Sequence, residues 1–329
     1  MVRRDVDDII EAVLVCRARA CQREFPIIDG IPILVADIPQ FLSDYEGPLL
    51  AREDLSAFTQ SLFADSLPTD SSFSYNRSTL SSYACTHYEL ASGLPALLAE
   101  SLPLLSSPPK GAWLDVGCAT AGGCFELAAR GADHVLGIDL NIAMLRFARV
   151  LLREGTATYQ RRVAGVVYEE RTITVAEEHR SKVEVWACSA TALPFYDGLF
   201  DGALSCNVVD SVDVPIFHLA ETGRVMKNGG EAIFASPYDW STTVTALPRW
   251  IGGHSQRSDS RGNSSDEMRR LLSDASPEEM SIALRLIREK DPVTWQVYLH
   301  ERSMMSYQTH VIVAAKPASP VTTNPEPTA

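Results

Sequence analysis

The sequence has no excess of basic residues, no long apolar run and no even set of cysteines. Its 329 residues include 29 Lys and Arg against 42 Asp and Glu, a formal net charge of −13. This balance argues against a protein that binds nucleic acid through many phosphate contacts, because such proteins present a basic face. No apolar run approaches the ~18–20 residues of a transmembrane helix, so no membrane partner is expected.

The cysteines and the first residues both favour a cytoplasmic protein. Seven cysteines scattered through a long chain fit reduced thiols better than a disulfide framework. Arg3 and Arg4 are followed at once by acidic residues, without the uninterrupted apolar stretch of a signal peptide. We therefore predict a globular protein of the cytoplasm, and the sequence leaves its oligomeric state open.

Changes in composition divide the chain into four parts. A short N-terminal segment covers residues 1–40, and a helical lead-in covers 41–110 and closes with a Pro-rich break. The main domain is predicted over 111–316. The tail, 317–329, has four prolines and almost no apolar residue, so we expect it to be disordered.

The main domain alternates apolar strands with helical patterns, which is typical of βαβ units and a parallel sheet. Strands are predicted over 112–116, 134–139, 183–188, 200–206 and 231–235, and helices around 124–129, 142–150 and 214–226.

Three further segments of this domain are predicted to turn or to pair locally. A turn is predicted at 227–230, and a small inserted hairpin at 161–175. The segments 293–302 and 309–316 are predicted to form an antiparallel pair at the sheet edge, joined by residues 303–308.

The first predicted strand ends in a small-residue turn that leads into a helix. Such a turn presents backbone N–H groups and the helix dipole to a ligand. Asp139 ends the next strand, 24 residues after Asp115, where a carboxylate can accept from two ribose hydroxyls. This pattern serves a dinucleotide or a nucleoside-containing sulfonium. Ala119 stands where a G-x-G-x-x-G motif needs its second glycine, which weakens the dinucleotide interpretation.

Four motifs in order resemble the class I S-adenosylmethionine-dependent methyltransferases: residues 114–128, 137–140, 192–209 and 223–240. The resemblance covers about residues 80–316. It implies a doubly wound, Rossmann-like α/β fold with a seven-stranded, mostly parallel sheet whose last strand is antiparallel. Residues 236–240 and 249–253 and the final hairpin are similar to a subgroup that includes the mercaptohistidine methyltransferase of the ovothiol pathway.

The resemblance also implies how the cofactor, S-adenosylmethionine, is held. Gly117 would let the backbone pass close under the methionine part, Asp115 would hold the amino group, and Asp139 would bind the ribose. The cofactor-binding residues implied in this way are Asp115, Gly117, Cys118, Ala119, Asp139, Leu140, Ser189, Ala190, Cys206 and Asn207.

Three positions depart from the family pattern. Ala119 and Ala121 stand where the loop usually has glycine, and a positive φ at either would cost about 1 kcal/mol or more. We expect the adjacent Gly122 and Gly123 to take up the turn instead. Ser189 stands where the family usually has Asp, and a hydroxyl accepts less strongly than a carboxylate.

The residues that face the methyl acceptor are harder to assign. Tyr83, His87 and Tyr88 match a helix that caps the cofactor in related enzymes. The candidate catalytic residues are His87, Asp210, Tyr238 and Asp239. Each has a structural alternative: a packed helix face for His87, a helix N-cap for Asp210, and a turn for the other two. Asp139 has one as well, since it could cap the helix that follows it.

Residues 14–35 resemble the second half of a small zinc-ribbon-like protein that activates tRNA and release-factor methyltransferases. Only Cys16 and Cys21 are present, with four residues between them. A tetrahedral structural zinc needs four ligands, so no metal is predicted. We expect this segment to pack on the catalytic domain.

The sequence thus predicts a methyltransferase that works by in-line displacement, in which the protein mainly aligns and desolvates the reactants. A small-molecule acceptor, amino-acid-derived or a secondary metabolite, is favoured because the segments 41–110, 161–180 and 240–290 could enclose it. The alternatives are a protein or translation-related acceptor, a catalytically silent interaction protein of the same fold and, more remotely, an NAD-dependent oxidoreductase.

Overall fold

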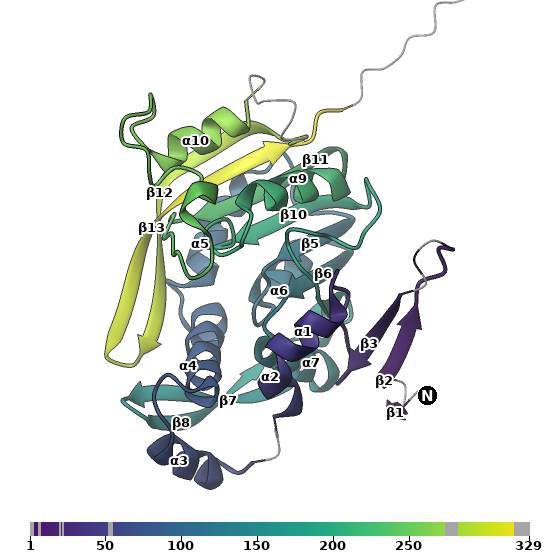
Figure 1. Cartoon of the computed structure of the whole chain (residues 1–329), viewed down its shortest axis with the longest axis vertical. Coiled ribbons are helices and arrows are strands. Elements are labelled where there is room, and N and C mark those ends of the chain that lie inside the picture. The colour runs from purple at the N-terminus through teal and green to yellow at the C-terminus, as the bar shows by residue number, and fades with distance from the viewer. Residues whose placement is uncertain are drawn as a thin grey trace, which may run out of the picture.

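A seven-stranded sheet runs through the middle of the molecule (Figure 1). The computed structural model describes residues 3–5, 8–19, 21, 23–51, 55–273 and 282–318. In spatial order the strands are β12 (Arg285–His300), β13 (Ser303–Ala315), β11 (Met226–Ser236), β10 (Phe200–Cys206), β5 (Ala112–Val116), β6 (His134–Asp139) and β9 (Val183–Ala187). Of these, β13 alone runs in the direction opposite to the other six. The predicted doubly wound fold with an antiparallel last strand is confirmed.

Helices cover both faces of the sheet, as the apolar strand sequences require. One buried apolar cluster joins the sheet to α5 (Leu94–Ser101), α6 (Gly122–Ala129) and α7 (Ile142–Glu154). A second cluster on the opposite face joins it to α9 (Pro215–Val225) and α10 (Ser264–Leu271). The remaining helical elements are α1 (Ile38–Asp44), α2 (Glu46–Leu50), α3 (Ala57–Ser66), α4 (Ser72–Ala84), η1 (Cys85–Glu89), η2 (Leu102–Leu104), α8 (Glu177–Arg180) and η3 (Leu247–Arg249).

Two predicted turns are wrong. Residues 227–230 belong to β11, where they form a bulge between the pairs Phe200–Met226 and Gly202–Glu231. Residues 303–308 belong to β13, because their alternating side chains continue the pairing with β12 and the chain reverses at 301–302. The C-terminal hairpin is therefore much longer than predicted.

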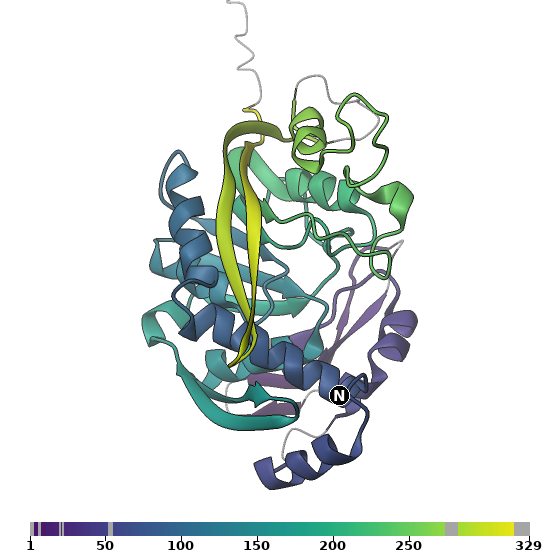
Figure 2. The same cartoon turned by 90° about the vertical axis from the view of Figure 1, so that its left-hand side faces the viewer.

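The long C-terminal hairpin and a second hairpin, inserted after α7, contact each other on one side of the sheet. The insertion predicted at 161–175 is present as β7 (Thr156–Ala164) and β8 (Val167–Thr174). Figure 2 shows β12 and β13 running down past α4 towards β7 and β8. The buried Arg161 of β7 joins them through an ion pair of 2.8 Å with Glu301 at the hairpin turn.

The N-terminal segment forms a small antiparallel sheet that packs on the edge of the large one. Its strands are β1 (Arg3–Asp5), β2 (Asp8–Val15), β3 (Glu24–Ile28) and β4 (Ile31–Pro32). Ile33 then pairs in parallel with Ala187 of β9, and Leu34 N–H donates to Ala187 O at 2.8 Å. Residues 319–329 of the predicted tail lie outside the described residues.

No helix within the described ranges combines the length and the apolar character that crossing a membrane requires.

A buried cation also contributes to the contact between the N-terminal sheet and the main domain. Arg146 of α7 donates to Asp29 Oδ2 at 2.6 and 2.8 Å and to the carbonyl oxygens of Pro48 and Leu49. We expect Arg146→Met to lower the free energy of unfolding by about 2 kcal/mol, since hydrogen bonds to charged groups are among the stronger ones. Urea denaturation measures this. Arg130→Met, at a solvent-exposed ion pair, is the control and should change stability by under about 0.5 kcal/mol.

Candidate functional site

The loop after β5 adopts left-handed backbone conformations at residues other than those expected. Gly117, Ala119 and Ala121 have φ of 71°, 49° and 66°. The expectation that Gly122 and Gly123 would take up the turn is wrong, because both are the first residues of α6. Glycine is needed there for space: a Cβ would lie 2.7 Å from His87 Cβ and 2.6 Å from Asp115 Oδ2, respectively.

Gly117 is required by both backbone conformation and packing. Its φ is in the region that glycine alone adopts without strain, and a Cβ would lie 2.4 Å from Cγ2 of Val208. The close approach in this structure is therefore to the protein's own loop after β10.

Asp139 holds the loop and keeps acceptor capacity for a ligand. Its Oδ2 accepts from the N–H of Ala119 at 2.9 Å, and Oδ1 accepts from the N–H of Asn141 at 2.8 Å. Each oxygen retains a second lone pair, so the carboxylate can still accept from two hydroxyls. The alternative role as a cap of the next helix is wrong, because Asn141 caps α7.

The segment η1, a single π-helical turn, is hydrogen-bonded to the loop after β5. His87 Nδ1 and Thr120 Oγ1 are hydrogen-bonded at 2.9 Å, and the hydroxyl of Tyr88 donates to Thr120 O. Burial lowers the pKa of His87 to about 3, so its imidazole is neutral at physiological pH. These contacts hold His87 and Tyr88 against the loop, and the role of Tyr83, His87 and Tyr88 in capping the cofactor stays a prediction.

A small cavity lies between the loop, η1, the end of β10 and the long hairpin. Its lining residues are Tyr83, His87, Leu94, Asp115, Gly117, Cys118, Gly123, Leu204, Cys206 and Trp295. Its volume of about 20 Å³ holds about one water molecule. A nucleoside ligand that places one end here has to widen it.

Sequence reasoning assigned six of these residues to the site and missed Trp295. The predicted members of the lining are Tyr83, His87, Asp115, Gly117, Cys118 and Cys206. Trp295 belongs to β12, 180 residues after Asp115, and only the pairing of β12 with β13 brings it over the cavity. Its alternation within 293–302 indicated burial, but nothing in the sequence indicated which cavity it would line.

The cavity combines a buried acid, Asp115, with a hydrogen-bond donor that has no partner, the indole N–H of Trp295. Asp115 is buried, and burial raises the pKa of its carboxyl to about 7; one oxygen accepts from the Cys124 thiol at 3.2 Å. The indole Nε1 of Trp295 is buried and has no hydrogen-bond partner. An acid and a free N–H donor fit the ammonium and the carboxylate of an amino-acid group.

The cavity thiols are not nucleophiles. Burial raises the pKa of Cys118 to about 11 and also raises that of Cys206, so both remain protonated near neutral pH. Both cysteines are free, and they act as small apolar residues.

The other predicted cofactor residues lie around the carboxyl edge of the sheet. Leu140 follows β6, Ser189 and Ala190 follow β9, and Asn207 follows β10. The hydroxyl of Ser189 is hydrogen-bonded to Thr191 Oγ1 at 3.0 Å.

Three of the four acceptor-side candidates do not line the cavity. The hydroxyl of Tyr238 is hydrogen-bonded to His310 Nδ1 at 2.8 Å, and Tyr238 packs against the apolar cluster on the opposite face of the sheet. Asp210 is buried and accepts from Asp239 N–H at 2.6 Å; it is not a helix N-cap, since Val214 holds that position. The exposed Asp239 accepts from the hydroxyl of Tyr307 at 3.3 Å.

The predicted absence of zinc stays a prediction. Cys16 and Cys21 lie beyond the end of β2, and the structure describes no group of three or more potential metal ligands in the ranges that it covers.

A doubly wound α/β sheet with an acid at the end of its second strand is typical of proteins that bind a nucleoside-containing ligand at the strand ends. Residues 114–234, from within β5 to within β11, match the family described as a methyltransferase domain. The chain is an S-adenosylmethionine-dependent methyltransferase, and S-adenosylmethionine is its cofactor. No curated protein matches the chain.

Several solved structures are similar in fold. One chain from the complex of the Haloferax volcanii Trm112 methyltransferase activator with a methyltransferase is 16% identical, with a TM-score of 0.44, and the match covers 78% of this chain and 97% of that one. A methyltransferase from Methanosarcina mazei is 21% identical over 63% and 92% of the two chains, with a TM-score of 0.40. Geranyl diphosphate methyltransferase is 15% identical over 68% and 85%, with a TM-score of 0.41.

The raised pKa of Asp115 predicts how stability depends on pH. The group's pKa is 3.8 when unperturbed and about 7 in the folded protein. Its contribution to stability is therefore fully present below about pH 4 and is lost as the pH rises through about 7. Between pH 5 and 7 the free energy of unfolding should fall by about 1 kcal/mol per pH unit relative to Asp115→Asn. Urea denaturation at several pH values measures this, and equal slopes for the two proteins would show that Asp115 titrates normally.

Proposed function

We propose that this methyltransferase acts on a small molecule. The observation that carries the proposal is the narrow cavity at the ends of β5 and β10, lined by His87 of η1 and by Trp295 of β12. Methyl transfer in a space of this kind suits a compact acceptor that is surrounded and desolvated, whereas a folded macromolecule needs an open surface.

The cofactor would lie along the carboxyl edge of the sheet with its amino-acid end in the cavity. Asp139 would accept from the ribose hydroxyls, and Ser189 with Ala190 would contact the adenine. Asp115 would hold the ammonium group and Trp295 Nε1 would donate to the carboxylate. This assignment accounts for the indole N–H that has no partner in the structure.

S-adenosylmethionine supplies an activated methyl group when bound, so the residues of this chain mainly have to align the acceptor with it. His87 is the candidate acceptor-side residue that lines the cavity. Because burial lowers the pKa of its imidazole to about 3, it would orient the acceptor through a hydrogen bond and would not take a proton from it. Asp210, Tyr238 and Asp239 would shape the loop after β11 and would not reach the reacting atoms.

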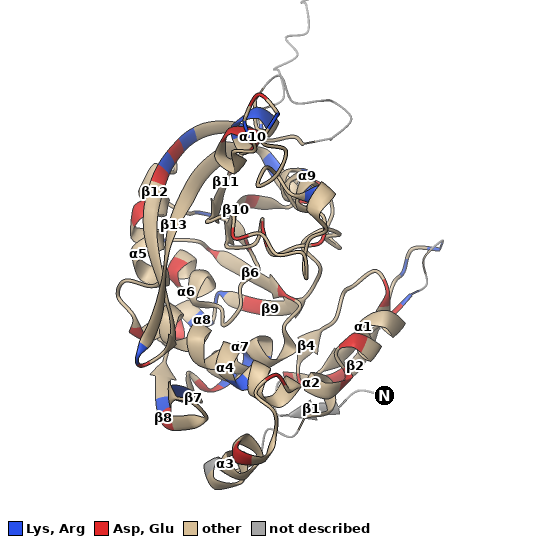
Figure 3. Cartoon of the chain, turned by 60° about the vertical axis from the view of Figure 1, so that its left-hand side comes forward, with Lys and Arg blue, Asp and Glu red and all other residues tan. Residues whose placement is uncertain are grey.

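The charge distribution favours a small acceptor over RNA. Strand β12 contains Arg288 and Lys290, and acidic residues alternate with them (Figure 3). Lys290 is paired with Glu100, and Arg288 lies 3.8 Å from Glu231. Because these two cations are paired with carboxylates, they are not free to bind phosphate groups.

The finer assignments are also part of this proposal. The likeness to mercaptohistidine methyltransferases favours an amino-acid-derived acceptor, and the free cysteines favour the cytoplasm. The zinc-ribbon-like N-terminal segment is the feature that keeps a protein or translation-related acceptor as the alternative.

Two ligands separate the ribose contacts from the amino-acid contacts. S-adenosylhomocysteine has both parts, whereas 5′-methylthioadenosine lacks the amino-acid end. We expect Trp295→Phe to weaken S-adenosylhomocysteine binding by about tenfold, because the donor N–H is lost, and to leave 5′-methylthioadenosine binding unchanged. Asp139→Asn should weaken both ligands. Calorimetry measures all four affinities, and a loss of both ligands in Trp295→Phe would contradict the assignment of Trp295.

A methyl-transfer screen tests the acceptor class. The purified enzyme and S-adenosylmethionine with a labelled methyl group are incubated separately with a metabolite extract and with a protein and RNA fraction. We expect label in the metabolite extract, and none in that extract with Asp139→Asn. Labelling mainly of RNA or protein would refute the small-molecule proposal. Absence of any cofactor binding at millimolar concentration would instead indicate a catalytically silent protein.

A further inference from the structure

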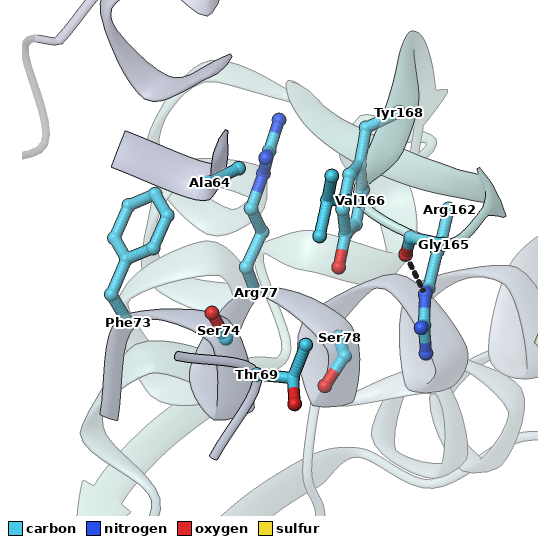
Figure 4. Close-up of a pocket in the computed structure, with 10 residues that line it drawn as sticks. All are labelled: Ala64, Thr69, Phe73, Ser74, Arg77, Ser78, Arg162, Gly165, Val166 and Tyr168. Atoms are coloured by element: carbon cyan, nitrogen blue, oxygen red, sulfur yellow. Dashed lines mark hydrogen bonds between the residues drawn. The ribbon is translucent and has the colours of Figure 1, made fainter. Parts of the chain in front are cut away.

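A second hollow lies away from the cofactor cavity, between α3, α4 and the β7–β8 hairpin (Figure 4). The two share no lining residue. The hollow has a volume of about 40 Å³, and its lining residues are Ala64, Thr69, Phe73, Ser74, Arg77, Ser78, Arg162, Gly165, Val166 and Tyr168. The lining therefore includes two arginines and no acidic residue, although the whole chain has a net charge of −13.

Arg77 presents a guanidinium group with unsatisfied donors in this hollow. Its Nε and Nη1 are buried and have no hydrogen-bond partner, and the structure shows no ion pair of Arg77 in the residues that it describes. Burial lowers the pKa of Arg77. Buried N–H groups of a half-buried cation that make no hydrogen bond are unfavourable, so this arrangement favours any ligand that supplies the missing acceptors.

Aromatic stacking fixes the guanidinium without satisfying its N–H groups. The Cζ of Arg77 lies 3.8 Å from the ring centroid of Tyr168 and 5.9 Å from that of Phe73. Figure 4 shows the guanidinium alongside the Tyr168 ring. A cation–π contact uses the face of the guanidinium, whereas its N–H groups point outward in the plane. The ring therefore orients these donors without satisfying them.

Three other polar groups of the hollow already have partners. Ser74 Oγ donates to Pro68 O at 3.1 Å and Ser78 Oγ donates to Tyr75 O at 3.0 Å. Arg162 donates its Nε–H to Gly165 O at 2.7 Å. Its charge, like that of Arg77, acts on the Tyr168 hydroxyl and opposes the rise in pKa that burial causes there. The lining is thus positive, and Arg77 contributes buried donors that lack acceptors.

We propose that this hollow binds an oxyanion, the carboxylate or phosphate group of a small molecule, with the buried N–H groups of Arg77 as donors. Both oxyanions accept charge-assisted hydrogen bonds from guanidinium, and a group of this size suits a volume of about 40 Å³. The remainder of such a molecule would extend from the hollow towards solvent. This inference does not depend on the identity of the methyl acceptor.

The binding test uses inorganic phosphate and acetate as separate probes, each titrated at constant ionic strength against chloride. We expect at least one of them to raise the melting temperature of the full-length protein with a saturable dependence. Saturation by phosphate alone assigns a phosphate ligand, and saturation by acetate alone assigns a carboxylate. Absence of a saturable effect of either probe up to about 100 mM would overturn the proposal.

Two arginine variants locate the site. Arg77→Met keeps the length of the side chain without its charge and should weaken the probe by about tenfold or more. Arg130→Met, at an exposed ion pair on α6, is the matched control and should bind as the unmodified protein does. Equal affinity in Arg77→Met and the unmodified protein would place the anion elsewhere.

A measurement on the unmodified protein covers the case in which Arg77→Met does not fold. Phenylglyoxal modifies accessible arginines, and mass spectrometry reports each site. The effective probe should protect Arg77 from modification and leave Arg130 unprotected. Equal modification of Arg77 with and without the probe would contradict the proposal.

Discussion

The backbone of residues 117–121 is the constraint on which the site depends. Three of these five residues have positive φ, two of them alanines, and a conformation of this kind persists only where its surroundings hold it. Asp139 accepts from the N–H of Ala119 on one side, and Thr120 is hydrogen-bonded to His87 and Tyr88 on the other. The strand ends, the loop and η1 therefore form one unit. A cofactor bound at the loop, as proposed above, would act directly on η1.

The chemistry of the cavity comes from buried polar groups that do not make all of their possible hydrogen bonds. Asp115 is near half-protonation at neutral pH, His87 is neutral, and the indole N–H of Trp295 has no partner. In a site from which water is largely excluded, each of these groups interacts strongly with a matching ligand group. The same reasoning applies to Arg77 of α4, which lies outside the cofactor cavity. In both places the unmade hydrogen bonds of the protein indicate the ligand, since a buried donor without an acceptor is rare in native structures.

The sheet was predictable from the sequence because each parallel strand is buried on both faces and reads as a short apolar run, as 112–116 and 134–139 do. The acid at the end of β6 was predictable for the same reason, since the strand fixes where Asp139 lies. The fold of 303–308 was not, because its side chains are partly exposed and only the pairing with β12 makes it a strand. Trp295 and Tyr238 show the same limit. Which cavity or core a side chain joins depends on strand pairing and loop direction, which local sequence does not encode.

The most direct test of the account is a crystal structure of the enzyme with S-adenosylhomocysteine. The account predicts the ribose hydroxyls on Asp139, and the amino-acid end in a widened cavity between Asp115 and Trp295, with η1 or the β12–β13 hairpin displaced from its present position. A ligand bound away from Asp139, or one whose amino-acid end lies outside the cavity, would contradict it.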